Sequence, residues 1–489
     1  MMIKNFKWLL LVSLTFAACN SDDNSGEVPE VPVTPGSAVF TNYVALGDSF
    51  AAGYSDGSLF VRGQEGAYVN ILAQQFAAAG GGTFKTPFMN DNTGGLLLGG
   101  NVITAPRLYF NGQAPVTVSG MPTTEVTKHL TGSFNNLGVP GAKSYHLVAP
   151  GYGNVAGVAS GAANPYYARF ASSPSATVLG DAVAQTPTFF TLWIGGNDVL
   201  GYATSGGIGK DQTGNLNPAT YGGNDITDPN VFANVYKTVV DNLTSKGAKG
   251  VIVNLPYVST LPYFTTVPYN PVPLDAATAT QLNTGYATYN GGLQAMVANK
   301  LLTAEEATRR TVTFKAGANA VVLVDSYLTD LSGFGVPSYR MATKEDLLVL
   351  TSRTVIGTTV GSDPSKINGV SVPLADNWVL TKNEIAEVKK ATDAYNITIE
   401  AIAKQKGLAF VDSKVVMNQL SSGGVKFGNY TISSTYVTGG AFSLDGVHPS
   451  ARGYALIANK FVEAINTTYG ATLRAVDLGA YPIQYPAKL

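Results

Sequence analysis

The sequence is poor in the side chains that hold metals and disulfides. Its 489 residues include one cysteine, Cys19, and three histidines, His129, His146 and His448. A lone cysteine cannot form an internal disulfide, and so few histidines argue against a histidine-rich metal centre. Long runs of like charge are absent too, and 31 Lys and Arg residues balance 32 Asp and Glu residues. We therefore expect a neutral or small substrate and no nucleic-acid partner.

The N-terminus has the pattern of a targeting segment. Lys4 and Lys7 precede an apolar stretch, 8–16, that is too short to span a bilayer. Ala17-Ala18-Cys19 then resembles the lipobox of bacterial lipoproteins, in which cleavage leaves the cysteine as the lipidated first residue. The alternative is an ordinary signal peptide cut near Ala18. We predict a signal peptide over residues 1–18 and a lipid anchor on Cys19, which would attach the protein to the outer membrane of a bacterial cell envelope.

The segment that follows Cys19 is polar and then rich in proline, with Pro29, Pro32 and Pro35, and it lacks the periodicity of a helix or strand. We predict a flexible tether over residues 19–41. The acidic residues Ser21-Asp22-Asp23 resemble a surface-export signal of some lipoproteins, although a solvated linker gives the same pattern. Exposure at the cell surface is therefore a further expectation.

From residue 42 onward, short apolar runs alternate with amphipathic helical patterns, which is typical of an α/β protein with a parallel sheet covered on both faces. Helix signals include a cap and first-turn proline at Asp228-Pro229, a capping box at Thr381 to Glu384, and a Ser450 cap. The expected strands lie at 43–46, 189–194, 251–253 and 408–411.

Three long stretches rich in Gly, Asn, Thr and Tyr separate these units, at about 58–132, 145–186 and 257–380. The third contains a helical pattern over 276–302 and a predicted hairpin of residues 312–314 and 321–324 around Gly317. We interpret the three stretches as insertions into one catalytic domain, 42–489. They would decorate the loop end of the sheet, where α/β proteins bind ligands.

Two short strings supply the groups of a serine nucleophile. Gly47-Asp48-Ser49 follows the apolar run 43–46, and Asp445-Gly446-Val447-His448-Pro449 lies near the other end of the chain. A serine hydroxyl needs an imidazole to accept its proton and a carboxylate to orient that imidazole. Asp445 and His448 are three residues apart, so one tight turn can join them. Each string alone is also ordinary turn chemistry, and the hypothesis depends on their pairing.

Two further strings offer hydrogen-bond donors for the oxyanion that forms when a carbonyl is attacked. Gly195-Gly196-Asn197-Asp198 follows the predicted strand 189–194 and places the side-chain amide of Asn197 at the end of that strand. Asn135 to Gly141 forms a glycine turn whose backbone N–H can point outward. An unspecialised loop is the alternative interpretation of both.

The ordered set of Gly47-Asp48-Ser49, Gly141, Gly195 to Asp198, and Asp445 to Pro449 resembles the SGNH hydrolases, also called GDSL esterases and lipases. Phe50 stands where the name-giving motif has leucine. The resemblance implies a three-layer α/β/α sandwich with a mostly parallel sheet, and ester hydrolysis without a cofactor or metal. It also implies a Ser49, His448 and Asp445 triad, and an oxyanion hole formed by Ser49, Gly141 and Asn197.

Other residues compete for these roles. Gly53-Tyr54-Ser55-Asp56-Gly57 fits the G-x-S-x-G elbow of the α/β-hydrolases, but no strand ends directly before it. His146 follows Gly141 closely but has no acid three residues before it, and His129 is interpreted as a polar surface residue. Ser49 and His448 are therefore preferred.

The substrate class stays open at this point. Acetylated carbohydrate suits polar, Tyr-rich insertions on an envelope protein, whereas an acyl lipid would need a wide apolar groove. Two alternatives to an esterase remain: a non-catalytic surface lipoprotein that binds glycans or a partner, and an acyltransferase with the same triad.

Overall fold

Five parallel strands form the central sheet of the computed structural model, which describes residues 32–489. Across the sheet their order is β17 (Ala409–Val411), β8 (Lys249–Val253), β7 (Phe189–Trp193), β1 (Tyr43–Gly47) and β6 (Asn136–Gly138). All five are buried or nearly so, as expected for a sheet covered on both faces. The predicted parallel sheet is confirmed.

The strand order reverses between β1 and β7. The chain moves outward from β1 to β6 on one side, and then crosses to β7, β8 and β17 on the other. In register, Gly47 at the end of β1 lies opposite Trp193 at the end of β7 and Gly138 at the end of β6. Such a reversal opens a crevice at the carboxyl ends of the strands, which is where doubly wound α/β proteins bind their ligands.

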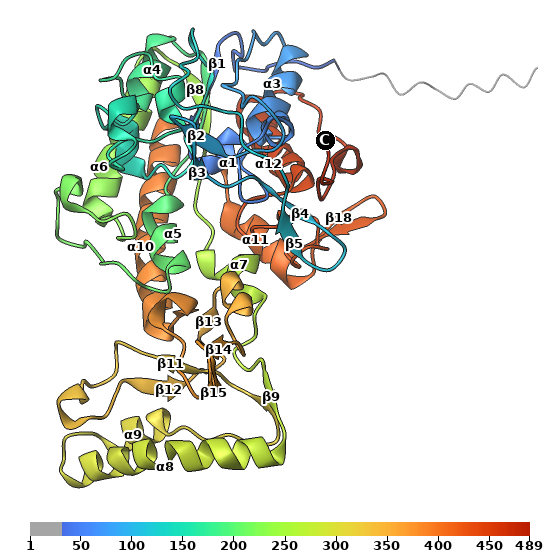
Figure 1. Cartoon of the computed structure of the whole chain (residues 1–489). Coiled ribbons are helices and arrows are strands. Elements are labelled where there is room, and N and C mark those ends of the chain that lie inside the picture. The colour runs from blue at the N-terminus through green and yellow to red at the C-terminus, as the bar shows by residue number, and fades with distance from the viewer. Residues whose placement is uncertain (1–31) are drawn as a thin grey trace, which may run out of the picture. The chain divides into compact units, whose positions relative to one another are not determined.

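Helices cover the two faces of the sheet and give a three-layer α/β/α architecture (Figure 1). On one face α3 (Tyr68–Ala77) packs against α12 (Ala451–Tyr469), which also contacts β17 and β8. On the other face lie α4 (Val178–Ala184), α6 (Pro229–Thr244) and α10 (Lys382–Lys406). A single large apolar cluster fills the space between the layers.

Local chemistry explains where these helices begin. The Asp228 carboxylate accepts the N–H groups of Asn230 and Val231 at the start of α6. The Ser450 hydroxyl accepts the N–H of Gly453 at the start of α12. The Glu384 side chain accepts the N–H of Thr381 before α10, which completes the predicted capping box. The three helix starts that the sequence indicates are thus confirmed.

The segments predicted as insertions differ in character. The first contains α2 (Val61–Glu65), the layer helix α3, and two small hairpins, β2 (Leu96–Leu98) with β3 (Asn101–Thr104) and β4 (Leu108–Phe110) with β5 (Pro115–Thr117). The second ends in the layer helix α4. Parts of both segments therefore belong to the layers themselves, because the apolar faces of α3 and α4 pack into the main core.

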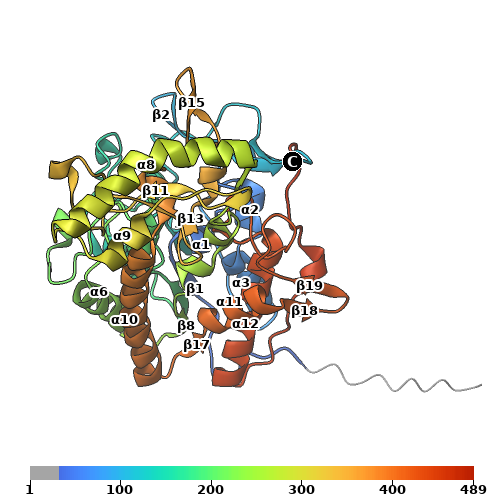
Figure 2. The same ribbon diagram turned by 90° about the horizontal axis from the view of Figure 1, so that it is seen from below.

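The third insertion, 257–380, has its own apolar cluster and lies next to the carboxyl edge of the sheet (Figure 1). Its long helix α8 crosses the strands of the insertion when seen from below (Figure 2). Its helices are α7 (Pro262–Thr265), α8 (Ala276–Ala298) and α9 (Ala304–Arg310). Its strands are β9 (Val272–Leu274), β10 (Gly317–Asn319), β11 (Val322–Val324), β12 (Tyr339–Met341), β13 (Leu347–Leu348), β14 (Thr359–Val360), β15 (Asp363–Ile367) and β16 (Val379–Leu380).

The predicted hairpin around Gly317 is wrong. Residues 312–314 form no strand, β10 pairs with β9, and β11 pairs with β12. Asn283 and Asn290 of α8 hold the backbone of Phe314 and Val312 through side-chain hydrogen bonds of 2.7–3.0 Å. Helix side chains thus replace the strand partner that the apolar pattern suggested.

The predicted tether extends too far. From Val33 onward the chain is part of the same compact unit as the rest, Val33–Leu489. Ser37 bonds to Tyr469 at the end of α12, Thr34 bonds to Thr472 just after it, and Phe40 stacks on Phe76 with ring centroids 4.1 Å apart. The apolar side chains Ala38 and Phe40, set among the polar residues, explain this packing. The predicted signal peptide and Cys19 lie outside the described residues.

The remaining elements are α1 (Ser49–Ala52), α5 (Asn197–Thr204), α11 (Ser413–Ser422), and the hairpin of β18 (Val425–Phe427) and β19 (Tyr430–Ile432). Among residues 32–489, no helix has the length and apolar character that crossing a membrane would require.

Candidate active site

Ser49 is the first residue of α1 and follows β1 with only Asp48 between them. The Asp48 carboxylate caps this short helix by accepting the N–H of Phe50 at 3.0 Å. The neighbouring strand approaches closely: a Cβ at Gly138 would lie 2.3 Å from the Ala52 nitrogen. Glycine at the end of β6 therefore lets α1 sit directly over the sheet edge, with Ser49 at the crevice.

The structure brings the three predicted triad residues together. The Ser49 Oγ lies 2.8 Å from Nε2 of His448, and Nδ1 of the same ring lies 2.9 Å from Oδ2 of Asp445. A carboxylate can only accept at neutral pH, so we assign the ring proton to Nδ1 and leave Nε2 as an acceptor for the serine hydroxyl. This arrangement lets His448 take a proton from Ser49.

Asp445 is held as a carboxylate. Burial alone would raise its pKa, but attraction to His448 and hydrogen bonds from that residue and from the Val447 amide outweigh it and lower the pKa to about 2. Its Oδ1 accepts the N–H groups of Val447 and His448 at 2.9 and 2.8 Å. The turn of residues 445–448 thus folds around its own acid, which keeps the acid charged and the imidazole oriented.

The third insertion supports this turn. Gly446 has a φ of +74°, and its carbonyl accepts the N–H of Tyr263 in α7 at 2.9 Å. A Cβ at Gly446 would lie 3.0 Å from the Tyr263 nitrogen and 3.1 Å from the Leu350 side chain. Glycine is needed here both for the left-handed backbone and for the close approach of the insertion.

Asn197 and Gly141 follow β7 and β6, the two strands that flank β1. Asn197 is the first residue of α5, after β7, and its Nδ2 donates to the Ala142 carbonyl at 3.0 Å. Gly141 has a φ of +80° in the turn after β6. Within residues 32–489, neither the Gly141 N–H nor the Ser49 N–H has a hydrogen-bond acceptor, and Asn197 has a second amide hydrogen to offer. Three donors therefore lie just after the carboxyl ends of β1, β6 and β7.

Asp198 fixes the spacing of these donors, a role that the sequence did not reveal. It is fully buried, and its two carboxylate oxygens accept the backbone N–H and the hydroxyl of Ser144 at 2.8 and 2.7 Å. Asp198, which follows Asn197, thus holds Ser144, which lies three residues after Gly141. The place of Asp198 in the string Gly195-Gly196-Asn197-Asp198 was the sequence signal that could have indicated this role.

The rival motif, residues 53–57, contacts the turn of residues 445–449. The Ser55 hydroxyl donates to the Pro449 carbonyl at 3.1 Å, and the Gly57 N–H donates to Oδ2 of Asp445 at 2.9 Å. The Tyr54 ring lies 4.6 Å from the His448 ring between centroids. These contacts place the motif beside the triad, and Ser55 has no imidazole partner.

The other two histidines lie elsewhere. His129 contacts the Ala171 carbonyl through Nε2 at 2.8 Å, and no described acid pairs with it. His146 accepts the Lys143 N–H on its Nδ1 at 3.0 Å and stacks on Tyr152. Burial and the positive charge of Lys143 lower its pKa to about 4. In the part of the chain that the structure describes, no cluster of His, Cys, Asp and Glu could hold a metal ion.

Comparison with known proteins gives the family of the chain. A family model described as GDSL-like lipase/acylhydrolase matches residues 43–461, which contain every residue of the site described above. Among solved structures, an extracellular lipase from Streptomyces rimosus matches at 12% identity, over 88% of this chain and 99% of that chain, with a TM-score of 0.28. No curated protein matches the chain. The extent of the family match shows that the chain belongs to the GDSL-like lipase/acylhydrolase family.

Proposed function

We propose that the protein is a carboxylic ester hydrolase in which Ser49 is the nucleophile, His448 the general base and Asp445 the orienting acid. The observation that carries the proposal is the continuous chain of contacts from Ser49 Oγ through the His448 ring to Asp445, at 2.8 and 2.9 Å. Membership of an acylhydrolase family agrees with it. A binding protein has no need of such a chain.

In the proposed reaction, Ser49 Oγ attacks the ester carbonyl while its proton moves to Nε2 of His448. The ring then carries a positive charge, which the Asp445 carboxylate stabilises. Collapse of the tetrahedral intermediate breaks the bond to the alcohol, which receives the proton from His448. Water, activated by the same imidazole, then hydrolyses the acyl-serine and regenerates the free hydroxyl.

The negative charge of the tetrahedral oxygen needs donors that are already in place. We propose that the N–H groups of Ser49 and Gly141 and the side-chain amide of Asn197 supply them. Support comes from the lack of an acceptor for the Ser49 and Gly141 N–H groups among residues 32–489. The contact between Asn197 and the Ala142 carbonyl uses one amide hydrogen and holds the amide beside the Gly141 turn.

A fluorophosphonate probe tests the nucleophile. We expect the wild-type protein to form one covalent adduct on the peptide that contains Ser49, and Ser49→Ala to form none and to lose p-nitrophenyl acetate hydrolysis. Ser55→Ala is the matched control, because Ser55 lies in the adjacent rival motif. Labelling that persists in Ser49→Ala and disappears in Ser55→Ala would contradict the proposal.

We further propose that Cys19 carries a lipid that anchors the protein to the outer membrane. The sequence Ala17-Ala18-Cys19 after a short apolar stretch supports this. Metabolic labelling with a palmitate analogue should mark the wild-type protein in the membrane fraction. Cys19→Ser should be unlabelled and leave that fraction. Equal labelling of both would exclude lipidation at Cys19.

A further inference from the structure

A pocket of about 660 Å³ borders the Gly141 turn. Its walls come from the β2–β3 hairpin, with Leu98 and Ile103, from the second insertion, with Tyr145, His146 and Tyr152, and from residues 221–223. Gly141 belongs both to the pocket lining and to the proposed oxyanion hole, so the pocket lies next to the proposed site of ester attack.

The pocket lining contains a single charged side chain. No Asp or Glu belongs to its lining, and its only cation is Lys143. The Lys143 side chain is buried, and its Nζ donates to the Asp225 carbonyl at 2.6 Å. The ammonium group is therefore already engaged on the protein side. A carboxylate or phosphate ligand would have to share this ammonium group with the Asp225 carbonyl.

His146 presents a fixed hydrogen-bond donor. Its Nδ1 accepts the Lys143 N–H, so the proton of the neutral ring is on Nε2. Stacking on Tyr152, with centroids 4.3 Å apart and planes 11° apart, holds the ring in place. Among the described residues, Nε2 has no hydrogen-bond partner, and it is not completely shielded from solvent. The Nε2–H is therefore accessible.

Tyr145 presents a second polar group beside the first. Its ring lies 4.4 Å from the His146 ring between centroids. Its hydroxyl also lacks a hydrogen-bond partner within residues 32–489, and the hydroxyl oxygen is not completely shielded from solvent. Burial and nearby negative charge raise its pKa, so the hydroxyl stays neutral at physiological pH and can donate or accept.

These features distinguish between ligand classes. A hydrocarbon chain in the pocket would cover the His146 N–H and the Tyr145 hydroxyl without replacing their hydrogen bonds to water, and each unpaired polar group would weaken binding. A sugar ring satisfies both, because its hydroxyls donate and accept while its C–H faces can pack on Leu98, Ile103 and the tyrosine rings. Neutral donors between apolar walls thus match a neutral, hydroxyl-bearing ring.

We propose that this pocket binds the sugar portion of an acylated, uncharged carbohydrate, and that His146 and Tyr145 hydrogen-bond to the sugar hydroxyls. The inference rests on the proposed ester hydrolysis at Ser49 and adds its substrate class.

The variants that test this remove single polar groups. Tyr145→Phe deletes one oxygen, and His146→Phe keeps an aromatic ring but deletes the donor. Tyr430→Phe is the control, because Tyr430 lies on the exposed hairpin β18–β19. The paired substrates are p-nitrophenyl acetate and an acetylated xylo-oligosaccharide, which share the acetyl group and differ in the alcohol. We expect both pocket variants to lower kcat/KM for the oligosaccharide at least tenfold relative to p-nitrophenyl acetate, mainly through KM.

Binding is measured separately, by calorimetry of Ser49→Ala with unacetylated xylotetraose. We expect binding that weakens when Tyr145→Phe or His146→Phe is added. If xylotetraose binds in this way but the wild-type enzyme hydrolyses no ester, the proposed function fails and the sugar site stands. If Ser49 reacts and cleaves p-nitrophenyl acetate but xylotetraose does not bind, the sugar site is overturned. Pocket variants that alter acyl-chain preference instead of the oligosaccharide ratio would also overturn it.

Discussion

The backbone N–H of Gly57 donates to Oδ2 of Asp445, the same oxygen that contacts the His448 ring. The distance is 2.9 Å in both contacts. Asp56 makes two more contacts with the same turn: its N–H donates to the Ser443 hydroxyl at 3.0 Å, and its Oδ1 accepts the Leu444 N–H at 2.9 Å. We call these two contacts and the Gly57 contact the clamp. The loop after α1 is therefore joined to residues 443–445 by three hydrogen bonds.

Asp56 should thus act as a positioning residue for the triad. It has a left-handed backbone, with a φ of +52°, and it is 2% exposed. Asp56→Ala removes the acceptor for the Leu444 N–H and strains the turn, and we expect kcat to fall on the order of 10²-fold with little change in KM. Asp56→Asn keeps the acceptor and tolerates the backbone, so it should recover most of the activity.

Kinetics with p-nitrophenyl acetate, together with a thermal melt, would measure this. Asp330→Ala is a matched control, because the exposed Asp330 likewise accepts a backbone N–H, from Ser332, within the third insertion. Asp56 would have no positioning role if Asp56→Ala kept wild-type kcat, or if Asp56→Asn lost as much as Asp56→Ala without any change in melting temperature.

Asp56 also predicts a pH dependence of stability. Burial raises its pKa to about 7; the Leu444 amide and Arg107 oppose the shift, and Asp445 adds to it. The native state therefore keeps a proton up to about pH 7 that the unfolded chain releases near pH 4. Between these values the native state binds more protons, so stability falls as pH rises.

Asp56→Asn removes this proton and its pH slope. We expect the free energy of unfolding of the variant to improve relative to wild type by roughly 3 kcal/mol between pH 5 and pH 8, as measured by urea denaturation. Asp48 and Glu384 also have pKa values raised to about 7 by burial, but they are present in both proteins and cancel in the difference. A difference that is flat with pH would show that Asp56 is ionised in the native state.

Asn197 gives a prediction about the transition state. Asn197→Ala removes one proposed oxyanion donor and should lower kcat about 10²–10³-fold while KM changes little, because the donor acts mainly on the developing charge. Asn230→Ala is the control, since Asn230 is an exposed residue in the first turn of another helix, α6. A proportional rise in KM with unchanged kcat would instead assign Asn197 to substrate binding.

The sequence predicted the parts of this molecule whose signals are local. The caps at Asp228, Ser450 and Thr381 act within one turn, so the helix starts could be placed from the sequence. The short apolar runs that predicted the strands of the parallel sheet are also local signals. The triad turn is local too, because Asp445 accepts the N–H groups of residues two and three positions later.

Contacts between distant segments were out of reach. The clamp from Asp56 and Gly57 joins residues almost 400 positions apart in the chain, with a separation of 388 between Gly57 and Asp445. Such pairings leave no period or spacing in a single sequence. The pairings of β10 with β9 and of β11 with β12, in place of a hairpin of residues 312–314 with 321–324, were missed for the same reason. The polar residues of α8 that replace a strand partner resemble an ordinary exposed face.

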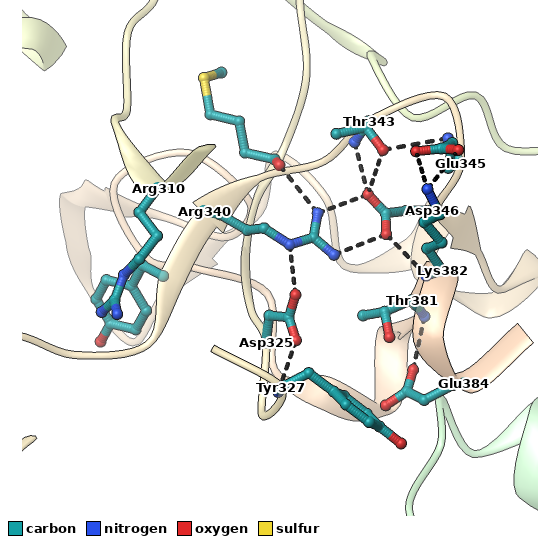
Figure 3. Close-up of polar contacts among 12 residues, drawn as sticks. Arg310, Asp325, Tyr327, Arg340, Thr343, Glu345, Asp346, Thr381, Lys382 and Glu384 are labelled. Atoms are coloured by element: carbon teal, nitrogen blue, oxygen red, sulfur yellow. Dashed lines mark hydrogen bonds and ion pairs between the residues drawn. The ribbon is translucent and has the colours of Figure 1, made fainter. Parts of the chain in front are cut away.

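The third insertion carries a buried ion cluster whose loss should be costly (Figure 3). Arg340 donates to both oxygens of Asp346 at 2.7 and 2.8 Å and to Asp325 at 2.5 Å. Asp346 also accepts the N–H of Thr343 at 2.7 Å, and its side chain is fully buried. The cluster joins β12 to the loop before β13, close to the start of α10.

Asp346→Ala would leave the Arg340 guanidinium half-paired in a largely buried site, and removing one partner of a buried pair typically costs about 3–5 kcal/mol. The adjacent Glu345→Ala is the control, because Glu345 pairs with Lys382 at the surface, where both side chains are more than half exposed, and such pairs contribute at most about 1 kcal/mol. Urea denaturation of the two variants measures the contrast. Equal and small losses would show that solvent reaches Arg340, whereas a loss confined to Asp346→Ala would establish the cluster as a main stabiliser of the insertion that supports the Asp445 turn.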